Sequence, residues 1–530
     1  MVTTVPPSHV DQARPATRPP GPEVSTAVTP VSGAVTGAVT GAGPSSRSHR
    51  SVLVGLCAAL VLCVLIPGYL VAYAPGPGQL QPGIGLLLWT QVGVTVWAGA
   101  NLTGMLATAT LRPLAFFFWT YVYIWLGVAG VAQVATGQSP VPVRGGTGYL
   151  ADAQLAVIIG LVGYLVGGRL VGRKPVGGRT AGAEPADAAD PVCSRRPIRG
   201  YLVAVAAFVA LSPLLVRRLG GLHALFTSRE ATSLVLRTGG LIAPDDKAAG
   251  TLLVSAVTVT AFMLLYGLLW KASLVGPLAA REWGGVVVLV ALNAVVNNPI
   301  SSARHWFGTV LVSILLLVPA VHRPRLARAG MAATLAALLL VFPYADHFRY
   351  TDPQDRAAHS PVQELVDKGD YDSFPQVRAA AEYVGANGHT LGRQIEGVLL
   401  FWVPRQAWPD KPLDTGILLA RFEGNSLNSN LSAPLWAESY LDFGLPGVLA
   451  IFVALGAVSR RADEAFVRDF RQRLPTAACL AVPVLAVYQV IVLRGSLLQS
   501  MFHLSLIAVL MVCLFRREEM RRGSPCSVVR

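Results

Sequence analysis

Long apolar stretches alternate with short polar or proline-containing segments along most of the 530-residue chain. Many of these stretches approach about 20 residues, the length that an α-helix needs to cross the hydrocarbon core of a bilayer. The pattern predicts an all-α polytopic membrane protein with about twelve transmembrane helices, near residues 51–73, 84–108, 114–136, 151–172, 200–216, 249–270, 283–299, 305–321, 328–344, 441–459, 476–493 and 498–515. Pro446 predicts a break near the start of the tenth helix, which neighbouring helices would accommodate.

Residues 1–50 have a different composition from the rest of the chain, with many Pro, Thr, Ser and Gly residues. Such a segment cannot bury a core, so we expect a disordered tail. It is too long and irregular for the n-region of a cleaved signal peptide, and the first apolar stretch is better interpreted as an uncleaved signal anchor.

The charge of the chain is best interpreted as a topology signal. The chain is 53% apolar and only 14% charged, with a net charge of +14, whereas a soluble protein carries roughly 25% charged residues. Most basic residues fall in alternate loops, which become the inner loops when both termini are placed inside. We therefore expect no nucleic-acid partner.

This orientation predicts five segments of the chain. They are the N-terminal tail over 1–50, nine spans over 51–344, a large outer loop over 345–440, three spans over 441–515, and a basic cytoplasmic tail over 516–530. Arg predominates over Lys and Ala, Gly and Val are abundant, which indicates a bacterial protein and hence the plasma membrane. No cysteine lies in an expected outer loop, so no structural disulfide is expected there.

Four arginines lie at outer ends of the expected spans, where positive charge is disfavoured. They are Arg229, Arg304, Arg405 and Arg494. Each could simply extend to lipid headgroups. Because the planar guanidinium pairs well with phosphate, we expect at least two of the four to share a phosphate site.

Among the outer carboxylates, Glu438 is the strongest candidate for a general base, because it lies just before the tenth span, where an unused charge is costly. Glu396 and Glu423 are expected to be solvated loop carboxylates. His305 is more readily interpreted as interfacial than as catalytic, although histidine is chemically able to act as a base.

Two further polar segments lie in the large outer loop. Asp370 and Asp372 could hold a divalent cation with a sugar nucleotide, but that donor is absent outside the cell, so we expect no metal site. The segment GNSLNSNLS supplies Asn425, Asn428 and Asn430. Amides and hydroxyls at this density suit recognition of sugar hydroxyls, and they equally suit an ordinary turn-rich loop.

The segment LLFWVPRQAWPDKP, residues 399–412, combines two tryptophans with prolines and opposite charges. Its apolar start is too short to span and predicts an interfacial or re-entrant segment. Trp402 and Trp408 suit the headgroup level, and their rings could also stack on sugars. The prolines predict a rigid elbow that holds Arg405 and Lys411 at the outer lipid surface.

Four blocks of the sequence carry a resemblance to a known family. They are GGLHALFTSRE, NNPISSARHWFG, FWVPRQAWPDKP with the downstream NSNLSAPLWAESYLDFGLPGVL, and VLRGSLLQ, which together cover roughly residues 217–500. In these blocks the chain resembles the oligosaccharide repeat-unit polymerases of bacterial surface polysaccharide assembly, the Wzy-type polymerases.

The resemblance implies a GT-C-like glycosyltransferase architecture and glycosyl transfer on the outer face of the membrane. Donor and acceptor would be oligosaccharides linked to polyprenyl pyrophosphate, with inversion at the anomeric carbon, no cofactor and no metal. A flippase and a chain-length regulator are implied partners beside the membrane lipids. We expect pyrophosphate contacts from Arg304, Arg405 and Arg494 with Lys411 assisting, and Glu438 as the base.

Other functions also fit parts of this pattern. A glycan ligase, or another transferase that uses a polyprenyl-linked donor, would share most of these features; a polyprenyl-phosphate-sugar transferase usually has acidic residues in its first outer loop, and YAPGPGQLQPG has none. A transporter or flippase would place charges in the middle of spans. A non-catalytic assembly partner is a further alternative.

Overall fold

The computed structural model describes residues 44–72, 84–141, 143, 148–172, 192–218, 221–226, 247–300, 302–342, 361–424 and 431–520. The predictions for the tail up to residue 43, for the basic tail beyond residue 520, and for Arg229, Asn425, Asn428 and Asn430 lie outside these residues. The chain divides into a unit up to Ser48 and a unit from His49 onwards, and the description below concerns the second unit.

Helices make up most of the described chain. In order they are α1 (Pro44–Ala59), α2 (Ile66–Val71), α3 (Ile84–Thr108), α4 (Pro113–Tyr121), α5 (Ala129–Thr136), α6 (Leu150–Gly172), α7 (Tyr201–Arg218), α8 (Gly221–Leu225), α10 (Lys247–Leu274), α11 (Ala280–Val296), α12 (Arg304–Leu316), α13 (Pro324–Ala336), α14 (Pro361–Asp367), α15 (Ser373–Asn387), α16 (Arg393–Leu399), α17 (Thr415–Phe422), α18 (Leu435–Arg471), α19 (Ala477–Arg494) and α20 (Leu497–Leu514). π-Helical segments, Leu60–Leu65, Val122–Val128 and Ala337–Val341, continue α1 into α2, α4 into α5, and α13 beyond Ala336.

Eight helices within the described residues are long and apolar enough to cross a membrane, judged by length and composition. They cover Ser51–Val71, Pro113–Thr136, Leu150–Val171, Leu252–Leu274, Pro324–Val341, Leu435–Arg471, Ala477–Arg494 and Leu497–Leu514. The chain is therefore an all-α polytopic membrane protein, as the apolar pattern predicts.

The four other spans predicted from the sequence correspond to helices that are shorter or more polar than these eight. α11 and α12 are shorter, and the 13 residues of α12 extend roughly 20 Å, less than the thickness of a bilayer core. α7 has 18 residues and ends on two arginines. α3 has 25 residues but carries Gln91, Thr95 and Asn101 along its length. The total of twelve spans stays a prediction.

The longest helix, α18, begins before the expected span and ends after it. Its backbone breaks at Gly444, where φ is 64° and ψ is −153°, two residues before Pro446. A side chain at Gly444 would be strained by this positive φ and would approach the ring of His389. The break that Pro446 predicts is thus present, and a glycine makes it possible.

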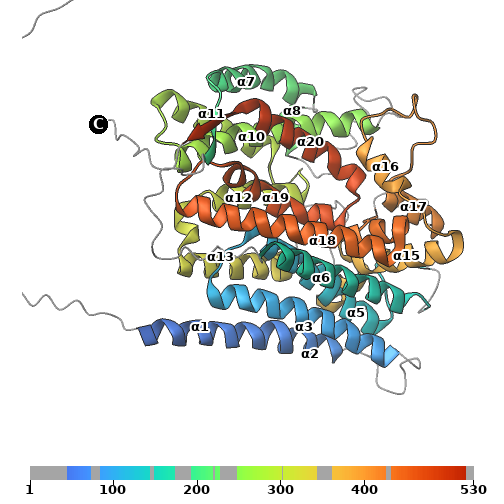
Figure 1. The fold of residues 1–530 in the computed structure, drawn as a ribbon. Helices are drawn as coiled ribbons and strands as arrows, with labels where there is room; N and C mark the ends of the chain where they lie inside the picture. The colour runs from blue at the N-terminus through green and yellow to red at the C-terminus, as the bar shows by residue number, and fades with distance from the viewer. Residues whose placement is uncertain are drawn as a thin grey trace, which may run out of the picture. The chain divides into compact units, whose positions relative to one another are not determined.

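α18 packs closely along α6 (Figure 1). Small residues allow the contact: a side chain on Gly167 would overlap the carbonyl oxygen of Val453, and one on Gly456 would overlap that of Tyr164. Such close approach of backbones is typical of helix packing in membranes. The rings of Tyr164 and Phe118 stack beside this interface.

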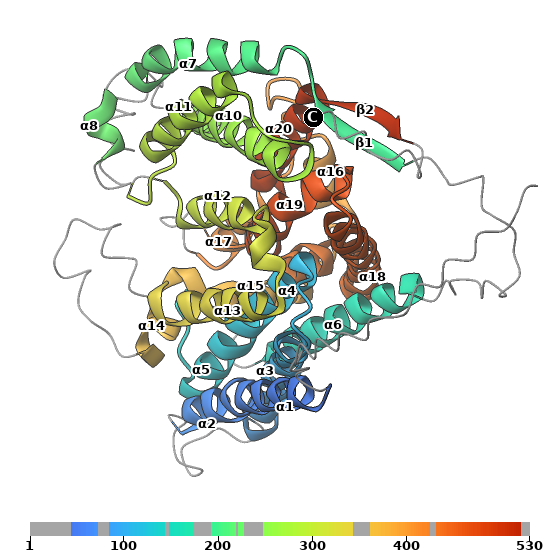
Figure 2. The same cartoon turned by 90° about the vertical axis from the view of Figure 1, so that its left-hand side faces the viewer.

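A two-stranded antiparallel ribbon pairs β1 (Val192–Pro197) with β2 (Phe515–Met520) (Figure 2). The apolar pattern does not predict these strands. Arg195 also donates its backbone N–H to the carbonyl of Pro475. Three segments assigned to the inner side from their basic residues therefore meet at one end of the helices.

Candidate functional site

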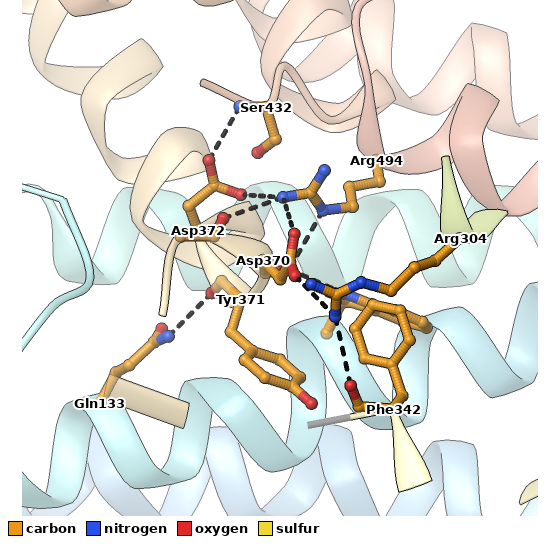
Figure 3. A network of polar contacts seen from close by, with 10 residues as sticks. Gln133, Arg304, Phe342, Asp370, Tyr371, Asp372, Ser432 and Arg494 are labelled. Atoms are coloured by element: carbon orange, nitrogen blue, oxygen red, sulfur yellow. Dashed lines mark hydrogen bonds and ion pairs between the residues drawn. The ribbon is translucent and has the colours of Figure 1, made fainter. Parts of the chain in front are cut away.

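A short 3₁₀ turn, Gly369–Tyr371, lies at the centre of a polar cluster (Figure 3). The indole nitrogen of Trp125 donates a hydrogen bond to the carbonyl of Asp370 at 2.9 Å. Gln133 of α5 donates to the carbonyl of Tyr371, also at 2.9 Å. Helical segments far away in the sequence thus fix the backbone of this turn.

Two of the four arginines that the sequence places at outer ends of spans, Arg304 and Arg494, meet at this turn. Arg494, the last residue of α19, lies 3.1 Å from Asp372 Oδ1 and 3.8 Å from Asp370 Oδ1. Arg304, the first residue of α12, lies 3.4 Å from Asp370 Oδ2, and its guanidinium also donates to the carbonyl of Phe342. Arg304 and Arg494 therefore lie at one turn, and a phosphate site shared by two of the four arginines stays a prediction.

The cluster balances two guanidinium groups against two carboxyls. Asp372 is 1% exposed and also accepts a hydrogen bond from the backbone N–H of Ser432 at 2.8 Å. Burial raises the pKa of the Asp372 carboxyl above its usual range, while Arg494 opposes the shift. Both guanidinium groups are therefore already paired with carboxyl groups of this turn.

The elbow of residues 399–412 directs its two cations inwards onto its own backbone. Arg405 donates to the carbonyls of Lys411 and Pro412 at 2.6 and 3.0 Å. Lys411 donates to the carbonyls of Phe401 and Val403 at 2.7 and 2.8 Å. Burial and the charge of Arg405 both lower the pKa of Lys411. The segment is a closed, cross-bonded loop.

The outside of this loop carries large apolar side chains. Trp402 is 65% exposed and Leu399 is 62% exposed, whereas Trp408 is partly buried. Leu391, just before α16, is 79% exposed. Apolar residues at this exposure next to membrane helices suit the headgroup region of a bilayer. The segment predicted to be interfacial or re-entrant, residues 399–412, begins at the last residue of the short helix α16 and continues as turns.

Two carboxyls become buried together where the elbow ends. Glu438, in the first turn of α18, is 3% exposed, and both its oxygens lie within 3.3 Å of the backbone nitrogen of Leu497. Asp414 is 7% exposed and caps α17 by accepting from the backbone N–H of Gly416 at 2.9 Å. Thr415, the residue after Asp414, donates a hydrogen bond to Gln394 at 3.3 Å, and Gln394 lines the same small pocket as Glu438. The negative charge of Asp414 opposes ionisation of Glu438, and burial raises the pKa of Asp414.

Three helices begin at this carboxyl pair. Asp414 caps α17, Glu438 lies in the first turn of α18, and Leu497 is the first residue of α20. The N-terminal ends of helices carry partial positive charge and unpaired N–H groups. A small pocket lined by Gln394, Glu438 and Leu497, among others, has a water-accessible volume of ≈ 10 Å³, room for about one water molecule.

The turn that joins α19 to α20 connects the two groups of side chains. Arg494 belongs to the arginine–aspartate cluster, and Leu497 contacts Glu438. The backbone N–H of Ala433 donates to the carbonyl of Arg494 at 3.1 Å, which brings the segment before α18 to the same place. Three of the four blocks that carry the resemblance therefore meet here.

Asp414 and Asp442 are the polar residues that the sequence analysis overlooks. Asp414 could have been found, because an aspartate before Thr-Gly and an apolar stretch is a typical helix N-cap. Asp442 accepts hydrogen bonds from the backbone of Gln394 and Ile395 at 3.1 and 3.0 Å and so caps α16. No local sequence signal indicates that long-range contact.

The remaining outer carboxylates have mixed outcomes. Glu396 is exposed, as expected for a solvated carboxylate. The same expectation for Glu423 is wrong, because its side chain is only 6% exposed. Phe422 packs edge-on against Tyr383 of α15 and draws the end of α17 beneath the surface. His305 is exposed beside Arg304.

Comparisons of the chain with protein-family models, with curated proteins and with solved structures return no match.

Proposed function

We propose that this protein polymerises oligosaccharide repeat units linked to polyprenyl pyrophosphate on the outer face of the bacterial plasma membrane. The observation that carries the proposal is the position of the turn between α19 and α20. It lies between the cluster of Arg304 and Arg494 and the buried carboxyls of Asp414 and Glu438. Cationic groups beside a candidate base are what transfer from a lipid pyrophosphate requires.

In the proposed reaction, Glu438 accepts the proton of a sugar hydroxyl on the lipid-linked acceptor. The freed oxygen forms a bond to the anomeric carbon of the donor glycan. The bond between that carbon and the pyrophosphate oxygen breaks, and polyprenyl pyrophosphate leaves with the electron pair. A direct displacement of this kind inverts the anomeric centre and uses no metal.

The arginines would stabilise the pyrophosphate leaving group. To do so, they would have to exchange their present carboxylate partners for phosphate oxygens. Arg304 and Arg494 face Asp370 and Asp372, so a pyrophosphate would have to replace carboxylate oxygens at one or both guanidinium groups. Arg405 is tied to the carbonyls just before Asp414. We therefore assign Arg405 and Lys411 a positioning role, with Trp402 at the lipid surface.

The arrangement of charges favours an enzyme over a transporter. Along each of the eight candidate spans, the Asp, Glu, Lys and Arg side chains lie towards the ends of the apolar stretch. α18 has none between Gly444 and Arg460. A transport path would place ionisable groups near the middle of the bilayer. A glycan ligase differs from a polymerase only in its acceptor and is resolved by experiment.

The test is the size distribution of lipid-linked glycans in a strain that lacks this protein. A polymerase predicts accumulation of a single repeat unit on polyprenyl pyrophosphate and loss of long polymer. In the deletion strain complemented with Glu438→Gln, the rate of polymer formation should be lower than with the unchanged protein by about 10²–10⁴-fold, the usual contribution of a general base.

The matched control is Glu396→Gln, which changes an exposed carboxylate of α16 and should restore normal polymer. Membrane levels of each variant are measured beside the glycans. Long lipid-linked chains that fail to leave the lipid would instead identify a ligase, and unchanged glycans would refute the proposal.

A further inference from the structure

The carboxyls of Asp414 and Glu438 have no cationic partner within the described chain. The groups that act on them are each other, the hydroxyls of Thr415 and Ser496, the amide of Gln499 and backbone N–H groups. Two buried carboxylates without a counter-charge cannot both ionise at low cost. One negative charge and one proton is the state that burial favours.

Two buried polar atoms of this group have no hydrogen-bond partner in the described chain. Asp414 Oδ2 is buried and has no hydrogen-bond partner, and the same is true of the hydroxyl oxygen of Ser496. Ser496 is 2% exposed and lies beside both carboxyls without a well-formed hydrogen bond to either. A proton held here would supply the donor that these oxygens lack.

The surrounding backbone favours a proton over a metal ion. α17, α18 and α20 all direct the positive ends of their dipoles towards the pair. Backbone N–H groups of Gly416 and Leu497 already occupy carboxyl oxygens. These features stabilise the charge of one ionised carboxyl and disfavour a metal cation, whereas burial and repulsion between like charges favour a proton on the other carboxyl.

We propose that Asp414 and Glu438 form one acid–base centre in which the two carboxyls hold a single proton between them. The catalytic role of this centre rests on the proposed glycosyl transfer, whereas the existence of the shared proton does not depend on that proposal. In that reaction the singly charged pair takes the proton of the acceptor hydroxyl, becomes neutral, and then releases one proton to water. Asp414 thereby becomes a further catalytic residue, three positions after Lys411 of the elbow.

The test is infrared spectroscopy of the purified full-length protein in lipid nanodiscs, comparing H₂O with D₂O at neutral pH. A protonated carboxyl gives a C=O stretching band that shifts on deuteration. We expect Asp414→Asn and Glu438→Gln each to remove the same band, equal in area to one carboxyl. The double variant should remove no more than either single one. Glu396→Gln, at an exposed carboxylate, should leave the band unchanged.

A band that survives either single substitution at full area overturns the shared proton. If these variants do not fold, Ser496→Ala supplies the test, because it keeps both carboxyls and removes the hydroxyl beside them. A shifted band then supports the pair, and an unshifted band refutes it. If the infrared band shows a shared proton but folded Asp414→Asn protein still makes normal polymer, the catalytic role of Asp414 is refuted and the shared proton is retained.

Discussion

At the scale of single residues, the role of a charged side chain in an unfavourable position depends on the group with which it pairs. Arg304 and Arg494 lie at helix ends that are predicted to face outwards, where positive charge is disfavoured, and both face aspartates of one turn. Arg405 instead donates hydrogen bonds to backbone carbonyls of its own loop. Arginines in equivalent sequence settings thus bind two different kinds of partner, aspartate carboxylates or backbone carbonyls.

Arg494→Gln should destabilise the protein by about 3–5 kcal/mol, because it leaves the buried Asp372 without its partner. The double variant Arg494→Gln/Asp372→Asn should recover part of that loss. Thermal unfolding in detergent measures both effects.

Arg468→Gln is the matched control for this prediction. Arg468 pairs with Asp469 at 2.9 Å, but its side chain is 53% exposed. Such a pair contributes about 0–1 kcal/mol. Equal losses of stability from Arg494→Gln and Arg468→Gln would show that the arginine–aspartate cluster does not stabilise the fold.

At the scale of elements, the contact between α6 and α18 positions the candidate site. Glycines let the two backbones approach, and Trp436 of α18 fills the space above Gly160. Trp436 lies two residues before Glu438, so this contact sets the depth at which the carboxyl is buried. Close packing of this kind tolerates added volume poorly.

Gly167→Ala should destabilise the protein by about 1–3 kcal/mol, because the added methyl group would overlap the carbonyl oxygen of Val453. Gly168→Ala is the control in the adjacent position, where the nearest atoms are 3.8 Å away or more. It should be neutral or slightly stabilising, since alanine favours helix over glycine. Equal melting temperatures for the two variants would contradict the packing described here.

At the scale of the whole molecule, helix ends that the charge pattern assigns to one side are found together. Arg328 of α13 donates to the carbonyls of Leu106 and Ala107 and to the hydroxyl of Ser51, joining three segments expected to lie inside. The ribbon of β1 and β2 joins two more. The arginine-rich segments that the sequence predicts to lie inside are therefore also joined by direct contacts.

Labelling of single cysteines in a cysteine-free variant should show opposite sides for the two ends of α18. Leu391→Cys, beside the start of α18, should react with a membrane-impermeant maleimide in intact cells. Gln472→Cys, directly after Arg471, should react only after permeabilisation. Both positions are exposed, so labelling of both in intact cells would contradict the proposed orientation.

The sequence by itself determined the membrane class, most helix positions and the distribution of basic residues, because apolar length and loop charge are local properties. It also located Glu438, since a carboxylate at the start of an apolar helix is locally anomalous. It also predicted α3 over the residues that the helix occupies, whereas whether α3 and the shorter α12 cross the membrane stays a prediction.

Only the tertiary structure decided which polar groups meet. Asp370 and Arg494 are far apart in the chain, and the pairing of Asp414 with Glu438 depends on three helix ends arriving at one place. The ribbon of β1 and β2 likewise joins segments at residues 192–197 and 515–520. Such contacts depend on how helices pack against each other, and packing is a property of pairs of surfaces that no single stretch of sequence contains.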